Sequence, residues 1–233
     1  MVTGSGLVAS AFAPAFAARR DVWVFAAGVS NSGCTAPTEF ARERARLSKA
    51  LGQAAEIGTF VYFGTCSVAD PEARATPYVQ HKLAMEALAR AHPGHLILRL
   101  PQTVGRTPNP HTLLNYLYAR VSRSEAFTLW RRARRSVIDI ADVARIGAAL
   151  IDAPVRGGDV INIATPFRHP VAEIVQALER AVGKEAVYEI VDRGSEYEID
   201  VSLAARVAEG LGISFGEDYL ERVIGKTYGE NRG

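Results

Sequence analysis

Cysteine is scarce in this sequence of 233 residues, with Cys34 and Cys66 its only two. Two cysteines can form neither a disulfide framework nor a cysteine-rich metal site, and such scarcity favours a reducing compartment, so we expect a cytoplasmic protein without a metal. Charge of one sign is lacking too, because 27 Lys and Arg face 25 Asp and Glu, for a net charge of +2. This near balance argues against a nucleic-acid partner.

Long apolar runs are also absent. No run reaches the roughly 18 residues that a membrane span needs, so no membrane partner is expected. Residues 7–18 are small and apolar, as in a secretory signal, but residues 1–4 carry no basic side chain, and Arg19 and Arg20 follow the run. The pattern therefore predicts no signal peptide.

Hydrophobic residues make up 48% of the chain, which is enough for the core of one large domain. Strand-like and helix-like segments alternate along most of it. The helix-like segments are 7–20, 37–55, 76–91 and 143–152, and the strand-like segments are 21–28, 60–63, 96–100 and 160–164. This alternation predicts an α/β fold with a parallel sheet.

The alternation is interrupted after Leu100. Residues 101–112 predict a long loop, and 113–121 a helix. A basic run at 131–135 is most simply a solvated surface, and residues 136–142 predict a short strand plus the cap of helix 143–152. Further on, the pattern predicts a helix at 171–182 closed by Gly183, a strand at 188–191, a helix capped by 200–202 and ending at Gly210, and a last helix at 219–224.

A glycine-rich turn stands near the start of the chain. Gly4, Gly6 and Ala9 form a Gly-x-Gly-x-x-Ala pattern between a very short strand and a helix. Glycines at such a turn let the backbone approach a diphosphate, which then lies at the helix N-terminus. The alternative is a turn of small residues that only packs.

The stretch from 59 to 99 carries the strongest chemical pattern. Thr65 ends a predicted strand, and Tyr78 and Lys82 lie four residues apart on the next helix, so their side chains share a face. A free Tyr has a pKa of about 10, and a nearby ammonium favours its phenolate. A hydroxyl beside a Tyr–Lys pair is what carbonyl reduction requires. The alternative is a packed Tyr with a solvated Lys.

Together these residues resemble the extended short-chain dehydrogenase/reductase family, in its NAD-dependent epimerase/dehydratase group, in a form shortened in the N-terminal cofactor-binding half. The resemblance rests on five motifs in the right order. They are the glycine turn, the strand end 26–28, Thr65 with the Tyr-x-x-x-Lys of 78–82, the segment 98–105, and the segment 135–144.

The resemblance implies a role for each matching residue. Tyr78 would exchange the proton, Lys82 would lower its pKa and hold the nicotinamide ribose, and Thr65 would bind the reacting oxygen. The implied cofactor-binding residues are Gly4, Gly6, Leu7, Ala26, Ala27, Gly28, Tyr78, Lys82 and Pro101. The implied substrate-binding residues, for a nucleotide-linked sugar, are Ser67, Asn109, Thr112, Leu113, Arg134 and Arg135, with the two arginines on the diphosphate.

The sequence departs from the family pattern at two places. The family's second strand, second helix and third strand are missing between the first helix and Asp21, and with them the acidic residue that reads the adenosine ribose. The cofactor is thus NAD or NADP, undetermined. Cys66 and Ser67 stand where sugar-nucleotide 4,6-dehydratases have an Asp-Glu pair, which disfavours dehydration.

The function that follows is keto reduction or epimerisation of a nucleotide-linked sugar in polysaccharide or glycan biosynthesis. Two alternatives stay open: a non-catalytic protein that binds a dinucleotide or nucleotide sugar, and a reductase for a non-sugar carbonyl compound.

The resemblance also implies an architecture. The fold would be a Rossmann-like doubly wound parallel sheet with a small C-terminal substrate-binding lobe. Residues 1–100 and 136–165 would form the core, and residues 101–135 and 166–233 the lobe, in one compact unit. A homodimer would form through helices 40–55 and 79–91.

Overall fold

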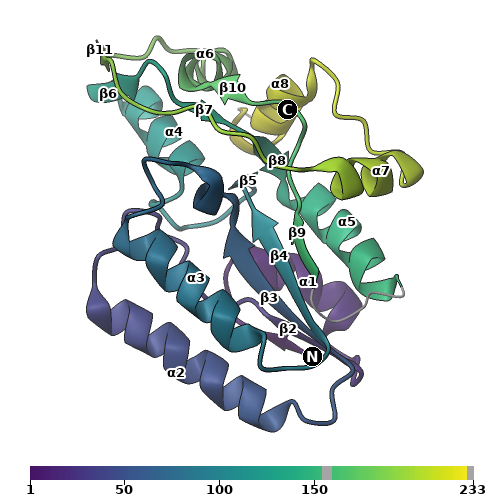
Figure 1. The fold of residues 1–233 in the computed structure, drawn as a ribbon. Coiled ribbons are helices and arrows are strands. Elements are labelled where there is room, and N and C mark those ends of the chain that lie inside the picture. The colour runs from purple at the N-terminus through teal and green to yellow at the C-terminus, as the bar shows by residue number, and fades with distance from the viewer. Residues whose placement is uncertain (154–158, 230–233) are drawn as a thin grey trace.

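The computed structural model describes residues 1–153 and 159–229. In this part of the chain a central sheet of five parallel strands has the order β1-β2-β3-β4-β9 (Figure 1). These strands are β1 (Val2–Thr3), β2 (Val22–Phe25), β3 (Thr59–Thr65), β4 (His95–Leu100) and β9 (Asp159–Asn162). The carboxyl ends of β3 and β4 point toward a lobe of smaller elements above the sheet. The predicted fold class is confirmed.

The inner strands are buried on both faces, as expected for a parallel sheet covered by helices. Successive side chains point to opposite faces. On one face, Val24, Val61 and Leu98 join a large apolar cluster that continues into the lobe. On the other, Phe25 and Tyr62 belong to a smaller cluster.

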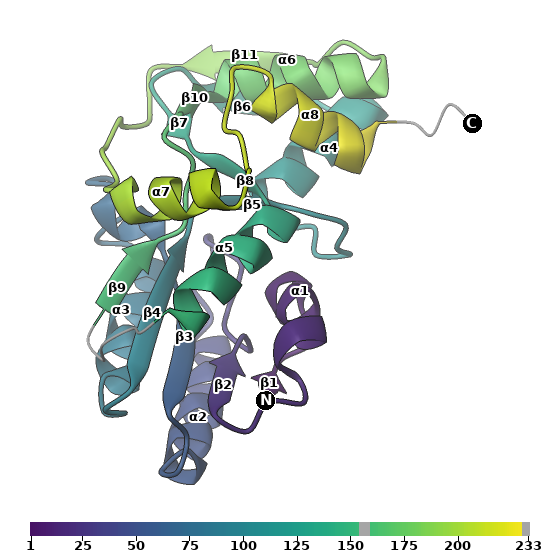
Figure 2. The ribbon, with the colours of Figure 1, turned by 90° about the vertical axis from the view of Figure 1, so that its right-hand side faces the viewer.

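Four helices cover the sheet. They are α1 (Leu7–Phe16), α2 (Pro37–Gln53), α3 (Pro77–Ala89) and α5 (Ile140–Asp152). The helices α1 and α5 pack together on one face, whereas α2 and α3 pack together on the other (Figure 2). This arrangement gives each side of the sheet its own helical layer.

The two layers give the first crossover an unusual hand. The strands β1, β2 and β3 follow one another across the sheet in one direction, but α1 and α2 lie on opposite faces. The β1–α1–β2 unit therefore winds with the opposite hand to β2–α2–β3, although about 98% of such units are right-handed. This departure agrees with the resemblance described above, which implies that a strand, a helix and a strand are missing between the first helix and Asp21.

The lobe is built from short strands and four helices. The helices are α4 (Leu113–Arg123), α6 (Val171–Val182), α7 (Ser202–Gly210) and α8 (Tyr219–Tyr228). The strands pair as β5 (Gln102–Val104) with β8 (Val137–Asp139), β6 (Phe127–Trp130) with β11 (Tyr188–Val191), and β7 (Arg134–Arg135) with β10 (His169–Pro170). Gly183 ends α6 at φ +72°, as its position predicts.

Most elements differ from their predicted bounds by a few residues, and three of the differences are described here. The helix α1 ends at Phe16, four residues before Arg20. The loop predicted at 101–112 contains β5, which the hydrogen bonds to β8 hold. The helix α5 begins at Ile140, because Asp139 rather than Asp142 caps it, accepting a hydrogen bond from the Ala141 N–H at 2.8 Å.

The predicted domain ranges 136–165 and 166–233 include residues 154–158 and 230–233, which lie outside the described residues. The division into core and lobe stays a prediction.

Candidate active site

The three predicted catalytic residues come together at the carboxyl end of β3. Thr65 is the last residue of β3, and its Oγ1 accepts a hydrogen bond from the Ser67 N–H (3.1 Å), which starts a short 3₁₀ helix, Cys66–Ala69. Thr76 caps α3 and Pro77 occupies its first turn, as the sequence predicts. Tyr78 and Lys82 therefore lie in the first turns of α3, both buried.

The environment of Tyr78 opposes its ionisation. Burial raises the pKa of Tyr78 above its usual value, and the Glu43 carboxylate raises it further. A hydrogen bond with Thr65 acts in the opposite direction and lowers it. Tyr78 is therefore held as a neutral phenol, which is the form that donates a proton to a carbonyl oxygen.

Lys82 is paired with a carboxylate that sequence reasoning missed. Its Nζ donates to Glu43 Oε1 at 3.1 Å and lies 4.6 Å from the centre of the Tyr62 ring. Burial lowers the pKa of Lys82, and the Glu43 carboxylate opposes that change. A signal for Glu43 existed, since it shares the buried stripe of α2 with Leu47 and Ala50, where a charge needs a partner.

His81 belongs to the same group. Its side chain is buried, with Nε2 at 2.9 Å from Glu43 Oε2. Its ring stacks on Phe40 with 4.4 Å between centres. His81 thus connects α3 to α2 through Glu43.

The positions after Thr65 carry no free acid. Burial raises the pKa of the Cys66 thiol, whose Sγ lies 3.5 Å from the Arg99 carbonyl oxygen. Ser67 is half-buried. Cys66 therefore stays a neutral thiol and offers no acid–base group for an elimination.

The predicted glycine turn lies between β1 and α1, next to the end of β2. Gly4 has φ +129°, and a Cβ there would lie 2.3 Å from the Ala26 carbonyl oxygen, so the turn packs directly against the end of β2. Gly6 precedes α1 without a side-chain cap, and no atom lies within 4 Å of where its Cβ would be. Open space thus faces the uncapped N–H groups of α1, and Leu7 opens that helix.

A cavity of about 440 Å³ extends from the glycine turn toward α2. Arg46, Lys49 and Gln53 of α2 lie on one helical stripe and line it. The sheet side is contributed by Thr3, Gly4, Ser5, Trp23 and Ala27. The cavity lies beside β1, the edge strand of the sheet.

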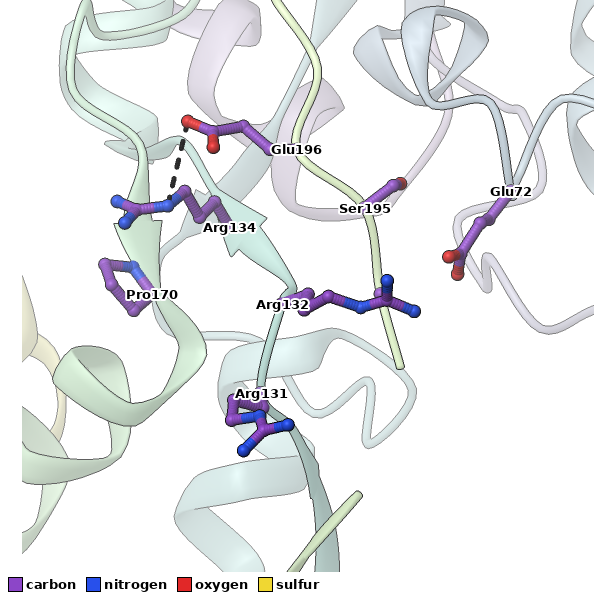
Figure 3. Close-up of a pocket in the computed structure, with 8 residues that line it drawn as sticks. Glu72, Arg131, Arg132, Arg134, Pro170, Ser195 and Glu196 are labelled. Atoms are coloured by element: carbon purple, nitrogen blue, oxygen red, sulfur yellow. Dashed lines mark ion pairs between the residues drawn. The ribbon is translucent and has the colours of Figure 1, made fainter. Parts of the chain in front are cut away.

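A second cavity, of about 500 Å³, lies between the lobe and the loop after the 3₁₀ helix (Figure 3). Three of its lining residues are arginines, and the carboxylates of Glu72 and Glu196 lie on opposite sides of it. Its lining residues are Glu72, Arg131, Arg132, Arg134, Pro170, Gly194, Ser195 and Glu196. Arg134 is the predicted substrate residue among them, and its Nε pairs with Glu196 at 3.7 Å. Arg131 and Arg132 both pair with Asp192, at 3.1 and 3.5 Å, so the arginines of this cavity already face carboxylates.

Asp70, in the loop that follows β3 and its 3₁₀ helix, contacts two residues of the lobe. Its Oδ1 accepts a hydrogen bond from the Ser195 hydroxyl at 2.5 Å, and its Oδ2 lies 3.8 Å from Arg135 Nη2. Arg135 is thus held beside the catalytic loop rather than in the lining of the second cavity. Sequence reasoning missed Asp70, because its partners lie far away along the chain.

The other predicted binding residues are more dispersed. Asn109 donates to the Ser30 hydroxyl at 3.0 Å, in the loop after β2. Thr112 caps α4 by accepting from the Asn115 N–H at 3.3 Å, and Leu113 packs against the large apolar cluster. Pro101 links β4 to β5. Their binding roles stay predictions.

Within residues 1–153 and 159–229, no three His, Cys, Asp or Glu side chains gather as a metal site would require. In that same part of the chain, no helix combines the length and apolar character of a membrane span.

A family model decides the identity. The model of the NAD dependent epimerase/dehydratase family matches residues 2–164, well over half of the chain. The protein belongs to this family. The predicted family is thereby confirmed, and its description as NAD dependent agrees with the predicted class of cofactor, NAD or NADP.

Solved structures show the same fold. UDP-glucuronic acid 4-epimerase from Bacillus cereus, in complex with UDP-glucuronic acid and NAD, has 20% identity and a TM-score of 0.69, over 88% of this chain and 74% of that one. UDP-glucose 4-epimerase from Thermus thermophilus, in complex with NAD, has 16% identity and a TM-score of 0.71, over 96% and 83%. RMD from Pseudomonas aeruginosa, complexed with NADPH, has 18% identity and a TM-score of 0.68, over 96% of each chain. No curated protein matches this family member.

Proposed function

We propose that this family member is an NAD(P)-dependent reductase or epimerase of a nucleotide-linked sugar and works in glycan biosynthesis. The observation that carries the proposal is the buried group of Thr65, Tyr78 and Lys82 at the carboxyl end of β3. Ligands of open parallel sheets bind at that end. The family, and neighbours bound to UDP-glucuronic acid or UDP-glucose with NAD, support the substrate class.

The residues divide the chemistry between them. Tyr78 donates a proton to the substrate carbonyl oxygen in reduction, or accepts one from a hydroxyl in oxidation, while Thr65 holds that oxygen by a hydrogen bond. Lys82 supplies the positive charge that stabilises the phenolate. A bound nicotinamide would exchange a hydride with the substrate carbon. The buried neutral Cys66 favours this chemistry over 4,6-dehydration.

Arginines of the lobe supply the substrate's anchoring. Arg134 lines the second cavity and Arg135 lies beside the catalytic loop, 18% exposed. Guanidinium groups bind diphosphate oxygens in pairs, which a small neutral carbonyl compound would not need. A nucleoside diphosphate sugar therefore fits better than a non-sugar substrate.

The cofactor's adenosine half fits the cavity beside the glycine turn. Arg46 and Lys49 place two cations there, and neither makes an ion pair within the described residues. Two cations suit the extra phosphate on the adenosine ribose of NADP(H). The proposal therefore favours NADP(H) over NAD(H), and it includes a homodimer formed through α2 and α3.

Titration of the purified protein with NADH, NADPH, NAD and NADP, followed by nicotinamide fluorescence and calorimetry, tests the proposal. Micromolar binding of one pair is expected, and NADPH-dependent reduction of a keto-sugar nucleotide should follow. If none of the four dinucleotides binds, the protein is a non-catalytic member of the fold. If dinucleotides bind but no nucleotide sugar does, the substrate class is wrong.

A further inference from the structure

One buried carboxylate lies at the centre of the catalytic side without a part in the chemistry described so far. Glu43 of α2 is 1% exposed and accepts four hydrogen bonds, two on each oxygen. Oε1 accepts from the Tyr62 hydroxyl (2.7 Å) and from Lys82 Nζ (3.1 Å). Oε2 accepts from the Val29 N–H (2.7 Å) and from His81 Nε2 (2.9 Å). These four donors come from three different segments of the fold.

The donors keep Glu43 ionised. Burial by itself raises the pKa of Glu43, but Lys82 and the hydrogen bonds from Val29, Tyr62 and His81 outweigh it, so the pKa lies below its ordinary value. A buried carboxylate without such partners would cost several kcal/mol. The site therefore holds a full negative charge close to the Lys82 ammonium.

Gly28 shows how closely this ion pair lies to the proposed cofactor site. A Cβ on Gly28 would stand 2.7 Å from Glu43 Oε1 and 2.9 Å from Lys82 Nζ. The backbone that follows the strand end Ala26-Ala27 thus passes directly over the pair. Any displacement of Glu43 would move the ammonium relative to that backbone.

We propose that Glu43 is a positioning residue for the reaction, which fixes the Lys82 ammonium under Gly28 and sets the charge that Tyr78 experiences. The inference rests on the proposed function, because it assigns Lys82 and Tyr78 to the proton transfer. According to this proposal, the Lys82 ammonium acts in the reaction while it is paired with Glu43 of α2. The acidity of Tyr78 is then set by the pair rather than by Lys82 alone.

The direction in which loss of the Glu43 charge would shift the pKa values of Lys82 and Tyr78 follows from the groups that face each of them. Lys82 is faced by Glu43 from α2, by Tyr62 from β3, and by Glu86 of its own helix, whose charge Arg99 of β4 pairs at 2.7 Å.

Tyr78 is faced by Glu43, by Thr65 and by the Cys66 thiol. Glu43 raises the pKa of both Lys82 and Tyr78. Removing its charge should lower both values, so both groups should lose their protons at lower pH.

Glu43→Gln tests the charge with nearly unchanged shape. Tyrosinate absorbance is titrated in Glu43→Gln and in wild type, each compared with its Tyr78→Phe derivative to isolate Tyr78. The Tyr78 signal should appear at lower pH in Glu43→Gln, and the alkaline limb of kcat/KM should move the same way. Glu39→Gln is the matched control, because Glu39 lies on the same helix but is only half-buried and pairs with Arg42. A folded Glu43→Gln protein with the wild-type Tyr78 titration would overturn the proposal.

Glu43→Asp covers the case in which Glu43→Gln does not fold. It keeps the charge but withdraws it from Lys82, so kcat should fall on the order of 10- to 100-fold, as small misplacements of catalytic groups do. The thermal midpoint should fall as well, because the hydrogen bonds of a buried carboxylate lengthen. A folded Glu43→Asp protein with wild-type kcat would overturn the positioning role. The tyrosinate titration needs no substrate or cofactor, so it separates failure of this inference from failure of the proposed function.

Discussion

The β3–α3 region and the β1–α1 region of this protein differ in how much of their family architecture they keep. In the β3–α3 region Thr65, Tyr78 and Lys82 are all buried, and Lys82 is joined to α2 through Glu43. The β1–α1 region has a two-residue edge strand and a crossover of unusual hand, and opens onto a shallow cavity. Chemistry needs a few groups at fixed positions, whereas cofactor binding is spread over a surface. A segment can therefore be lost from the binding surface while the chemical groups stay in place.

The largest expected effect separates the two regions directly. Tyr78→Phe removes the proton donor but not the surface that holds the dinucleotide. Turnover should fall by about 10²- to 10⁴-fold, the usual contribution of a general acid–base group. Cofactor Kd should stay within about twofold of wild type, since Tyr78 is buried in the β3–α3 region and lies outside the cavity lining. Stopped-flow reduction and fluorescence titration measure the two quantities.

Retained turnover in Tyr78→Phe would remove Tyr78 from the proton transfer. Ser202→Ala is a suitable control, because Ser202 begins α7 in the lobe and caps no helix with its side chain.

The two regions also differ in how far the sequence predicted them. Thr65, Tyr78 and Lys82 lie within one stretch, so local spacing predicted that they meet, and Thr76-Pro77 predicted where α3 begins. Glu43 contacts Lys82 from 39 residues away, and Ser195 contacts Asp70 from 125 residues away. The residues next to Glu43 or to Asp70 in the sequence do not indicate that either has a partner so far along the chain. Only the charge on the buried stripe of α2 indicated that Glu43 must have a partner.

Local ambiguity explains the smaller errors. Asp139 and Asp142 both precede apolar helical residues, and either is a good N-cap. The tertiary fold decides between them. Asp142 accepts a hydrogen bond from the Tyr219 hydroxyl at 2.7 Å, and Asp139 is the residue that caps α5. Likewise, β5 is three residues long and exists through its pairing with β8, which the sequence of 102–104 alone does not indicate.

A second prediction tests whether the lobe supplies the substrate affinity. Arg135→Ala removes a cation that is held 3.8 Å from Asp70 and is 18% exposed. Loss of a charged hydrogen bond to a diphosphate should weaken nucleotide-sugar binding by about 1.5–3 kcal/mol. Cofactor Kd should not change, because Arg135 belongs to β7, away from the glycine turn. Calorimetry with UDP-glucose and with UDP measures the change.

The same measurement on Arg145→Ala provides a control, because Arg145 is an exposed arginine of α5 that bonds to the Leu211 carbonyl oxygen. Equal UDP-glucose affinity in wild type and Arg135→Ala would exclude the diphosphate contact.

The smallest expected effect addresses the shortened region itself. If α2 replaces the lost second strand in holding the adenosine ribose, Arg46→Ala combined with Lys49→Ala should weaken NADPH binding about tenfold, or about 1.4 kcal/mol, and leave NADH binding nearly unchanged. The effect is modest because both side chains are exposed, where water and salt screen their charge. Arg44→Ala is the matched control, since Arg44 is an exposed cation of the same helix that does not line the cavity.

Raising the salt concentration should reduce the preference of the wild type for NADPH and have little influence on the double variant. Equal losses for NADPH and NADH would mean that the two cations attract the diphosphate rather than the ribose phosphate. No loss at all would show that the shortened region holds the dinucleotide through the glycine turn alone.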